Sequence, residues 1–143
     1  MSKVLGWLIA VTVVCFIAVL VSGSVSVFFD PLTLIYTVIF IYGLTVVVFG
    51  LSKAINSILG FKYLFIEKPE KDPNLSVVYK NQMQIAVFSG IIHILIVTTG
   101  LLSQGVFNNN EALEPALAVA MLGIVYPTLI SGLVYYPLHK RLA

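Results

Sequence analysis

His93 is the side chain with the clearest capacity for chemistry. It lies within Met83 to Gln104, a stretch of 22 residues without Asp, Glu, Lys or Arg. Because imidazole titrates near neutrality and is costly to bury in hydrocarbon, His93 is a candidate for proton transfer or for small-molecule transport. The alternative is a neutral imidazole that hydrogen-bonds a backbone carbonyl or a Ser/Thr hydroxyl of a neighbouring helix.

Small residues recur at helical spacing around His93 and in a later apolar stretch. One face carries Ala86, Gly90, His93, Val97, Gly100 and Gln104, and another carries Ala116, Ala120, Gly123, Pro127 and Ser131. In lipid, such faces mark close van der Waals packing. They pack helices of one chain together, line a central space, or grip a partner helix. Pro127 removes an internal hydrogen bond and is expected to kink its helix, whereas Pro115 and Pro137 are expected near helix ends.

Several kinds of chemistry are missing. No Asp or Glu lies within an apolar stretch, so the chain lacks the buried acid that many proton-coupled devices use. Cys15 is the only cysteine, which excludes an intramolecular disulfide and a CxxC metal site. Thr98 and Thr99 face an aqueous path or bond their own i−4 carbonyls. We expect no enzymatic activity, no cofactor and, without a basic patch interleaved with aromatics, no nucleic acid partner.

These residues lie on four apolar stretches of 18, 22, 22 and 23 residues, in a chain that is 59% hydrophobic with a mean hydropathy of +1.05. About 20 apolar residues span a bilayer as a helix, and backbone groups in lipid need internal partners. The sequence predicts an all-α membrane protein of one domain. Its four transmembrane helices, at 4–21, 31–52, 83–104 and 115–137, would form two hairpins.

The positive charges predict an orientation. All eight Lys and Arg residues precede the first stretch, follow the fourth, or fall in the linker between the second and third. By the positive-inside rule these segments and both termini are cytoplasmic. A cleaved signal peptide at the N-terminus is the less favoured alternative, and it would leave three spans.

The linker, residues 53–82, is the only segment long enough for soluble structure. Apolar residues at Ile55, Ile58, Leu59, Tyr63 and Ile66 predict an amphipathic helix at headgroup level. The charged stretch 67–73, with Pro69 and Pro73, predicts a turn that ends it. The linker is too short for a catalytic domain.

The fourth stretch resembles the last helix of the MotA/TolQ/ExbB family and is closest to MotA. The resemblance rests on residues 114–142, EPALAVAMLGIVYPTLISGLVYYPLHKRL, which match a pattern of Gly-Pro-Ala-Met-Ala-Val-Ala, a Gly-Thr or Thr-Thr step and a terminal Pro. Residues 28–34, FFDPLTL, resemble the outer turn of MotA, and Gly90 with the two following Ile residues resembles the start of its third helix.

The resemblance implies a ring of five subunits, in a bacterial inner membrane, around a single-span partner of the MotB/ExbD/TolR kind. The partner's Asp would bind and release protons or sodium ions, which would account for the missing acid here. Spans three and four would line the central space. The implied channel-facing or partner-facing residues are Gly90, His93, Val97, Gly100, Pro115, Ala116, Ala120, Gly123, Ile124, Pro127, Thr128 and Ser131.

Two departures from the family define the alternatives. The large cytoplasmic insertion of the family is reduced to thirty residues, and Ile124 replaces the channel-facing Thr, leaving Thr128 or water to supply polarity. The favoured hypothesis is a stator-type proton channel subunit acting outside the flagellar motor. The competing hypotheses are a non-conducting scaffold of the same architecture and a small transporter that uses His93.

Overall fold

A computed structural model describes residues 2–23, 28–104 and 110–143, and within these ranges the chain is helical without strands. The elements follow one another as α1 (Ser2–Ser22), α2 (Pro31–Phe49), α3 (Leu51–Leu59), the 3₁₀ helix η2 (Gly60–Leu64), α4 (Pro73–Ser103), α5 (Asn110–Ile130), the π-helical η4 (Ser131–Tyr135) and α6 (Tyr136–Leu142).

Four helical stretches of the described residues are long and apolar enough to cross a membrane. They are Lys3–Val21, Pro31–Phe49, Pro73–Ser103 and Leu113–Leu142, with mean hydropathies between 2.1 and 2.9. The predictions of an all-α fold and of a multi-pass membrane protein are confirmed at this level.

The two Asp-Pro pairs of the chain begin two of these helices. The Asp30 carboxylate accepts hydrogen bonds from the Leu32 and Thr33 amides, and the Asp72 carboxylate accepts one from the Leu75 amide at 3.0 Å. Each Pro follows at N1, where its missing N–H costs nothing. α4 therefore begins at Pro73, ten residues before the predicted start at Met83, and at 31 residues it is about 46 Å long, longer than the hydrocarbon core.

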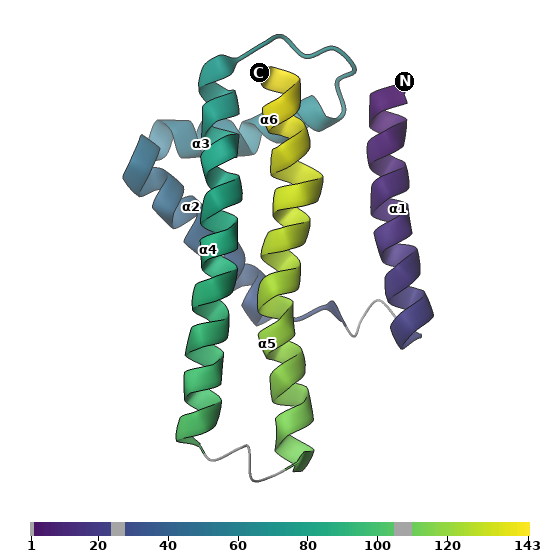
Figure 1. Cartoon of the computed structure of the whole chain (residues 1–143). Coiled ribbons are helices and arrows are strands. Elements are labelled where there is room, and N and C mark those ends of the chain that lie inside the picture. The colour runs from purple at the N-terminus through teal and green to yellow at the C-terminus, as the bar shows by residue number, and fades with distance from the viewer. Residues whose placement is uncertain (1, 24–27, 105–109) are drawn as a thin grey trace.

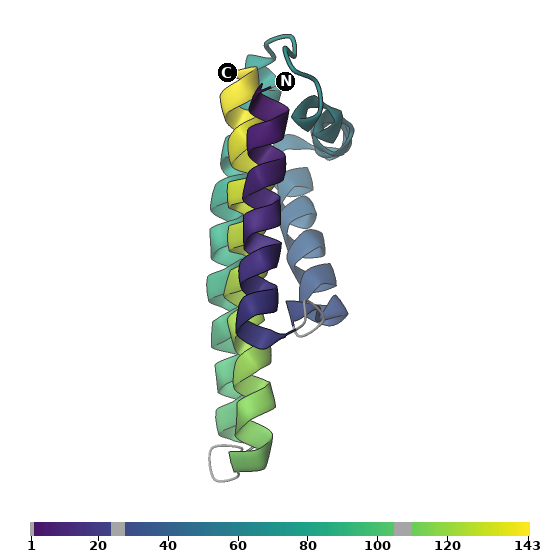
Figure 2. The same cartoon turned by 90° about the vertical axis from the view of Figure 1, so that its right-hand side faces the viewer.

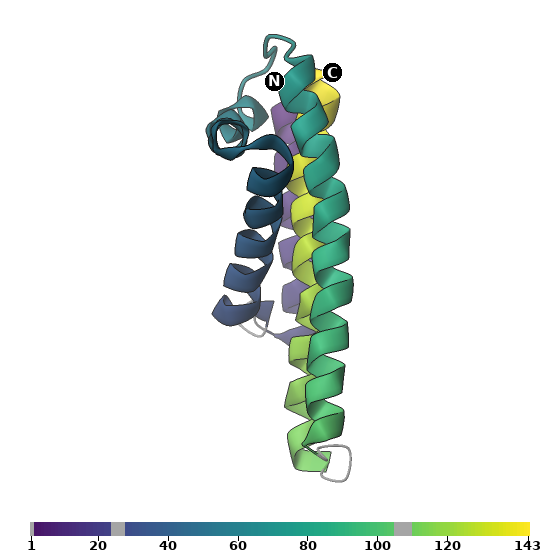
Figure 3. The same cartoon turned by 90° about the vertical axis from the view of Figure 1, so that its left-hand side faces the viewer.

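α4 and α5 run antiparallel and pack against each other, with η4 and α6 continuing the line of α5 (Figure 1). α2 covers one side of this pair, and α3 lies on the same side near the end where the termini lie (Figures 2 and 3). α1 stands to the side of α5 and meets the rest of the chain mainly at η4. The lower parts of α4 and α5 extend past the lower ends of α1 and α2 (Figures 1 and 2).

Both termini and α3 lie at the same end of the molecule, which we call the basic end because it carries Lys3, the linker lysines, Lys140 and Arg141. α3 lies across the direction of α4 and α5 and is seen nearly end-on in Figure 2. It buries Ala54 and Ser57 and exposes Ile55, Ile58 and Leu59. This is the arrangement expected of the predicted amphipathic segment, with the apolar face available to lipid.

The most buried side chains gather at the basic end, where α2, η2, α4, η4 and α6 meet. Ile41, Val78, Tyr79, Tyr135 and Leu138 are between 0 and 2% exposed. Hydrogen bonds fasten the same region, since the Asp72 amide donates to the Leu142 carbonyl and the Arg141 guanidinium donates to the Leu64 carbonyl. The ends of α4 and α6 at the basic end, which lie outside the predicted apolar stretches, are therefore part of the core.

The helix containing Pro127 does not break at that proline. α5 continues to Ile130, and the irregular turn is the π-helical η4, where the Tyr136 amide donates to the Ser131 carbonyl. Pro137 lacks an N–H, so the Leu133 carbonyl four residues earlier loses its helical donor. The Trp7 indole of α1 donates to that carbonyl at 2.5 Å. The carbonyl that Pro137 leaves without a helical donor thus helps to hold α1.

Candidate functional site

The closest approach of α4 and α5 occurs at Gly90, Gly123 and Pro127. A Cβ on Gly90 would lie 2.9 Å from the Gly123 carbonyl oxygen and 3.5 Å from the Pro127 ring. That carbonyl is the one that Pro127, four residues later, leaves without a helical donor. Gly90 and Pro127 are buried, so the two backbones meet where neither presents a side chain beyond the Pro ring. The small faces here pack two helices of one chain.

His93 fills the space that Gly123 leaves. A Cβ on Gly123 would fall 1.9 Å from His93 Cδ2, and the other side of the imidazole packs on the Tyr36 ring with centroids 5.3 Å apart. The side chain is 9% exposed, and its Nε2 is buried without a hydrogen-bond partner among the described residues. Nε2 does not make the hydrogen bond to a carbonyl or hydroxyl that a structural role would give it, so this nitrogen is available to bind a water molecule.

The twelve residues predicted from sequence divide by exposure. Gly90, His93, Ala120, Gly123 and Pro127 are buried within the chain, and Val97, Gly100, Ala116 and Ser131 are half-buried. Pro115, Ile124 and Thr128 are exposed. Of the two nearby threonines, Thr99 donates to its own i−4 carbonyl, Leu95, at 2.7 Å, as one of the sequence interpretations expected.

The face of α4 and α5 turned away from α2 is covered by no other described element (Figures 2 and 3). On α5 the exposed Leu117, Met121, Ile124 and Thr128 are spaced four, three and four residues apart, so they form one stripe. A hollow of about 160 Å³ beside it is lined by Gly90, Ile94, Ile124, Pro127 and other residues. Leu117 and Met121 were not among the residues predicted from the sequence, because each stands one residue after a member of the small face.

A pocket of about 450 Å³ lies on the other side of His93. It is formed by α2, α4 and α5 and is lined by Asp30, Thr33, Tyr36, His93, Val97 and three further residues. Asp30 lies in the connection between α1 and α2, at the N-cap of α2, and beside Tyr126 of α5. The Tyr126 hydroxyl accepts from the Asp30 amide and donates to the Phe28 carbonyl. The Asp30-Pro31 cap motif could have indicated its fixed position, but not its neighbour.

The electrostatics of this pocket favour an ionised Asp30. The Thr33 hydroxyl and amide donate to its carboxylate, as does the Leu32 amide. The pKa of Asp30 is lowered first by the Thr33 hydroxyl, against an opposing effect of burial, and slightly by His93. The pocket therefore combines an anionic cap with an imidazole whose Nε2 is unpaired.

A second polar group, not anticipated from the sequence, is buried near the basic end. Gln82 is 0% exposed and donates to the Ser57 hydroxyl at 3.0 Å and to the Thr45 hydroxyl at 3.3 Å. The Tyr79 hydroxyl donates to the Ser57 carbonyl at 2.7 Å. These hydrogen bonds join α2, α3 and α4. They could not be predicted from the sequence, where Gln82 is only a polar residue next to a predicted span boundary.

No group of three or more His, Cys, Asp or Glu side chains that could hold a metal ion occurs among the described residues. Comparisons with protein families, with curated proteins and with solved structures found no match.

Proposed function

We propose that the chain is the ring subunit of a MotA-like stator complex, five copies of which surround an Asp-bearing, single-span partner in a bacterial inner membrane. The basic end is cytoplasmic, with both termini on that side. The complex couples ion flow, of protons in the first instance, to motion or force. The chain itself binds no cofactor and catalyses no reaction.

The observation that carries the proposal is the uncovered face of α4 and α5. Ile124 is 44% exposed on that face, and Thr128 lies one turn further along the same stripe. The family resemblance assigns the helices that carry these residues to the central space. The small residues Gly90, Gly123 and Pro127 hold α4 and α5 together, so the partner would contact Leu117, Met121, Ile124 and Thr128.

The polar groups of the chain support a role for a partner acid. The stripe on α5 carries one hydroxyl, Thr128, and no ionisable side chain. Asp30 and His93 line a pocket on the side of α2, away from that stripe. A protonatable group at the level of Ile124 and Thr128 would therefore come from another chain.

Site-directed cross-linking tests the arrangement. In a Cys15→Ser background, Ile124→Cys and Thr128→Cys should each form a disulfide with a cysteine placed along the single helix of the co-expressed partner. Val47→Cys is the matched control, because Val47 is 78% exposed on α2 and would face lipid. Cross-links at Val47 and none at Ile124 would contradict the proposal, as would native mass spectrometry showing a monomer with the partner present.

Conduction is measured separately. Liposomes that contain the chain and its partner should acidify when a proton gradient is imposed, and Asp→Asn in the partner should abolish the flux. Thr128→Val should reduce the flux if the hydroxyl lies on the path. Unchanged flux in both variants would exclude this path.

A second candidate function is a non-conducting scaffold with the same ring. The exposed Ile124 favours it, because an apolar side chain then occupies the position of the family's channel-facing Thr. A complex that forms the Ile124 cross-link but carries no proton flux would establish it.

The pocket that contains Asp30 and His93 favours a third candidate, a small transporter. His93→Ala is the test, and substrate movement that survives this substitution would exclude it.

A further inference from the structure

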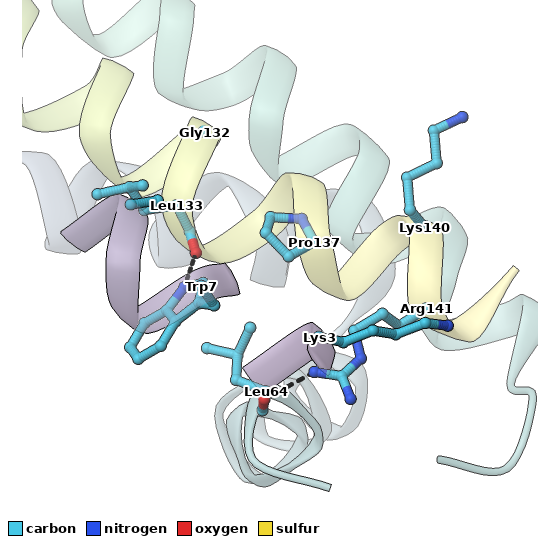
Figure 4. A pocket seen from close by; sticks show the side chains of 9 residues that line it. Lys3, Trp7, Leu64, Gly132, Leu133, Pro137, Lys140 and Arg141 are labelled. Atoms are coloured by element: carbon cyan, nitrogen blue, oxygen red, sulfur yellow. Dashed lines mark hydrogen bonds between the residues drawn. The ribbon is translucent and has the colours of Figure 1, made fainter. Parts of the chain in front are cut away.

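Two pockets lie between α1 and the helix formed by α5, η4 and α6. The one near the basic end is a cleft of about 410 Å³, lined by Lys3, Trp7 and Ala10 of α1, Leu64 of η2, and residues of η4 and α6 (Figure 4). Within its spanning stretch no residue of α1 is buried. A helix this exposed must be covered by something apolar.

Three cations line this cleft without a carboxylate among the lining residues. Lys3 comes from α1, and Lys140 and Arg141 come from α6. Arg141 is held in place, because its guanidinium donates to the carbonyls of Leu64, Ile66 and Glu67. These acceptors are backbone carbonyls, which hold the guanidinium in place without neutralising its charge. The Nε of Arg141 is buried without a hydrogen-bond partner among the described residues. The cleft therefore suits a singly charged anion such as a phosphate diester.

The same gap continues as an apolar groove. A second pocket of about 350 Å³ is lined by Val14, Cys15 and Ala18 of α1, Val125 and Leu129 of α5, and four further residues, none of them charged. From Lys3 to Val14 the helix rises about 16 Å, which is close to half of the ~30 Å hydrocarbon core. The cations and the groove are thus separated by about the thickness of the hydrocarbon layer of one leaflet.

Trp7 fixes the width of the cleft. Its indole donates to the Leu133 carbonyl, and its ring packs edge-on against Phe65 with centroids 5.5 Å apart. Figure 4 shows the indole on one wall of the cleft, with Lys3 and Arg141 further along it. Trp is favoured at the membrane interface, where an amphipathic ring meets headgroups.

We propose that this cleft binds an anionic phospholipid, of the phosphatidylglycerol class, from the leaflet at the basic end. The headgroup phosphate lies near Lys3 and Arg141, Lys140 adds positive charge at the rim of the cleft, and an acyl chain runs between α1 and α5 toward Cys15 and Val125. The lipid fills the gap that protein contacts leave beside α1. The site is independent of the proposed ring function, because every residue that forms it belongs to one chain.

The single tryptophan makes the test direct, since the cleft contains the only indole of the protein. The full chain is reconstituted in phosphatidylcholine vesicles that contain a minor fraction of lipid brominated on the upper acyl chain. Phosphatidylglycerol carrying the bromines should quench Trp7 fluorescence several-fold more efficiently than brominated phosphatidylcholine at the same fraction. Each lysine near a charged surface contributes up to about a fivefold preference for anionic lipid, so Lys3→Gln/Lys140→Gln should bring the ratio close to one.

The matched control is Lys62→Gln/Lys80→Gln, which removes two exposed lysines from the linker and α4, near the basic end but outside the cleft. It should keep the wild-type ratio. Arg141 is left intact in both variants, because its bonds to η2 contribute to folding. Equal quenching by the two lipids in the wild type would overturn the proposal, and so would an equal loss in the control, which would indicate general surface attraction.

Two other occupants are distinguished by the same assay. Absence of quenching by either lipid would mean that protein, such as a second copy of the chain, covers α1. Recovery of fluorescence on addition of millimolar inorganic phosphate would identify a simple anion site. Either result would exclude the lipid.

Discussion

The first helix, α1, and the three helices α2, α4 and α5 are all apolar enough to span a membrane, but they are packed in opposite ways. In α2 and α4, 22% of the most apolar window is buried within the chain, whereas in α1 none of it is. α4 meets α5 through glycines and a buried His93, and meets α2 through Gln82 and Tyr36. The contacts of α1 with the rest of the chain include the Trp7 indole hydrogen bond and an aromatic contact with Phe65. Hydropathy finds spans but does not reveal which spans a fold depends on.

The physical reason for the difference is the solvent. Lipid chains are as apolar as Leu or Val, so burying an apolar side chain against another helix gains little unless the shapes fit closely or polar groups pair. α4 and α5 fit closely at Gly90, Gly123 and His93, and polar groups of α4 and α2 pair at Gln82 and Thr45. α1 lacks both features except at Trp7, and its exposed Phe16 and Leu20 are suited to lipid.

The largest expected effect comes from truncating one large apolar side chain in each region. Ile41→Ala, at a fully buried position of α2, should lower the free energy of unfolding by about 2–5 kcal/mol. Phe16→Ala on α1 removes a larger side chain that is 60% exposed and should change it by less than about 0.5 kcal/mol. Unfolding in bicelles, followed by steric trapping, measures both. Similar losses would show that α1 is packed as tightly as α2.

The number of spans and their approximate positions follow from the sequence because both depend on uninterrupted apolar length. The start of α4 does not follow, because Pro73 was interpreted as ending a helix when, after Asp72, it begins one. The small face of α5 was identified from Ala120, Gly123 and Pro127, but spacing cannot distinguish a neighbouring helix from a partner. The Gln82 bonds depend on contacts between α2, α3 and α4 that no local pattern encodes.

The next prediction tests the contact between α4 and α5. Gly123→Ala should cost about 1–3 kcal/mol, because its Cβ would overlap the His93 ring. Gly100→Ala, where a Cβ meets nothing within 4 Å, is the control and should be neutral or slightly stabilising. A double-mutant cycle with His93→Ala should recover part of the loss, since the clash is removed. Additive losses in the double variant would mean that another contact limits this site.

A smaller effect concerns the cap of α2 beside the His93 pocket. Asp30→Ala should lower the free energy of unfolding by about 0.5–2 kcal/mol at neutral pH, whereas Asp30→Asn should keep most of the capping. Because the folded-state pKa of Asp30 lies below its ordinary value of 3.8, the stabilisation that ionisation adds is present above that pH. It is lost as the pH falls through the folded-state value. The wild-type advantage over Asp30→Asn should therefore shrink below about pH 4. A difference between them that stays constant with pH would show that Asp30 is not ionised.

The smallest effect tests the attachment of α1. Trp7→Phe removes the hydrogen bond to the Leu133 carbonyl, and a net loss of about 0.5–1.5 kcal/mol is expected. Since α1 has few other contacts, the loss should appear as movement of α1 and not as global unfolding. Spin labels on Cys15 and on Val125→Cys, which face one pocket, should give a broader distance distribution in this variant. Thr12→Val is the control, because the Thr12 hydroxyl bonds only the Leu8 carbonyl of its own helix. Equal broadening in the control, or none in Trp7→Phe, would show that lipid and not the indole sets the position of α1.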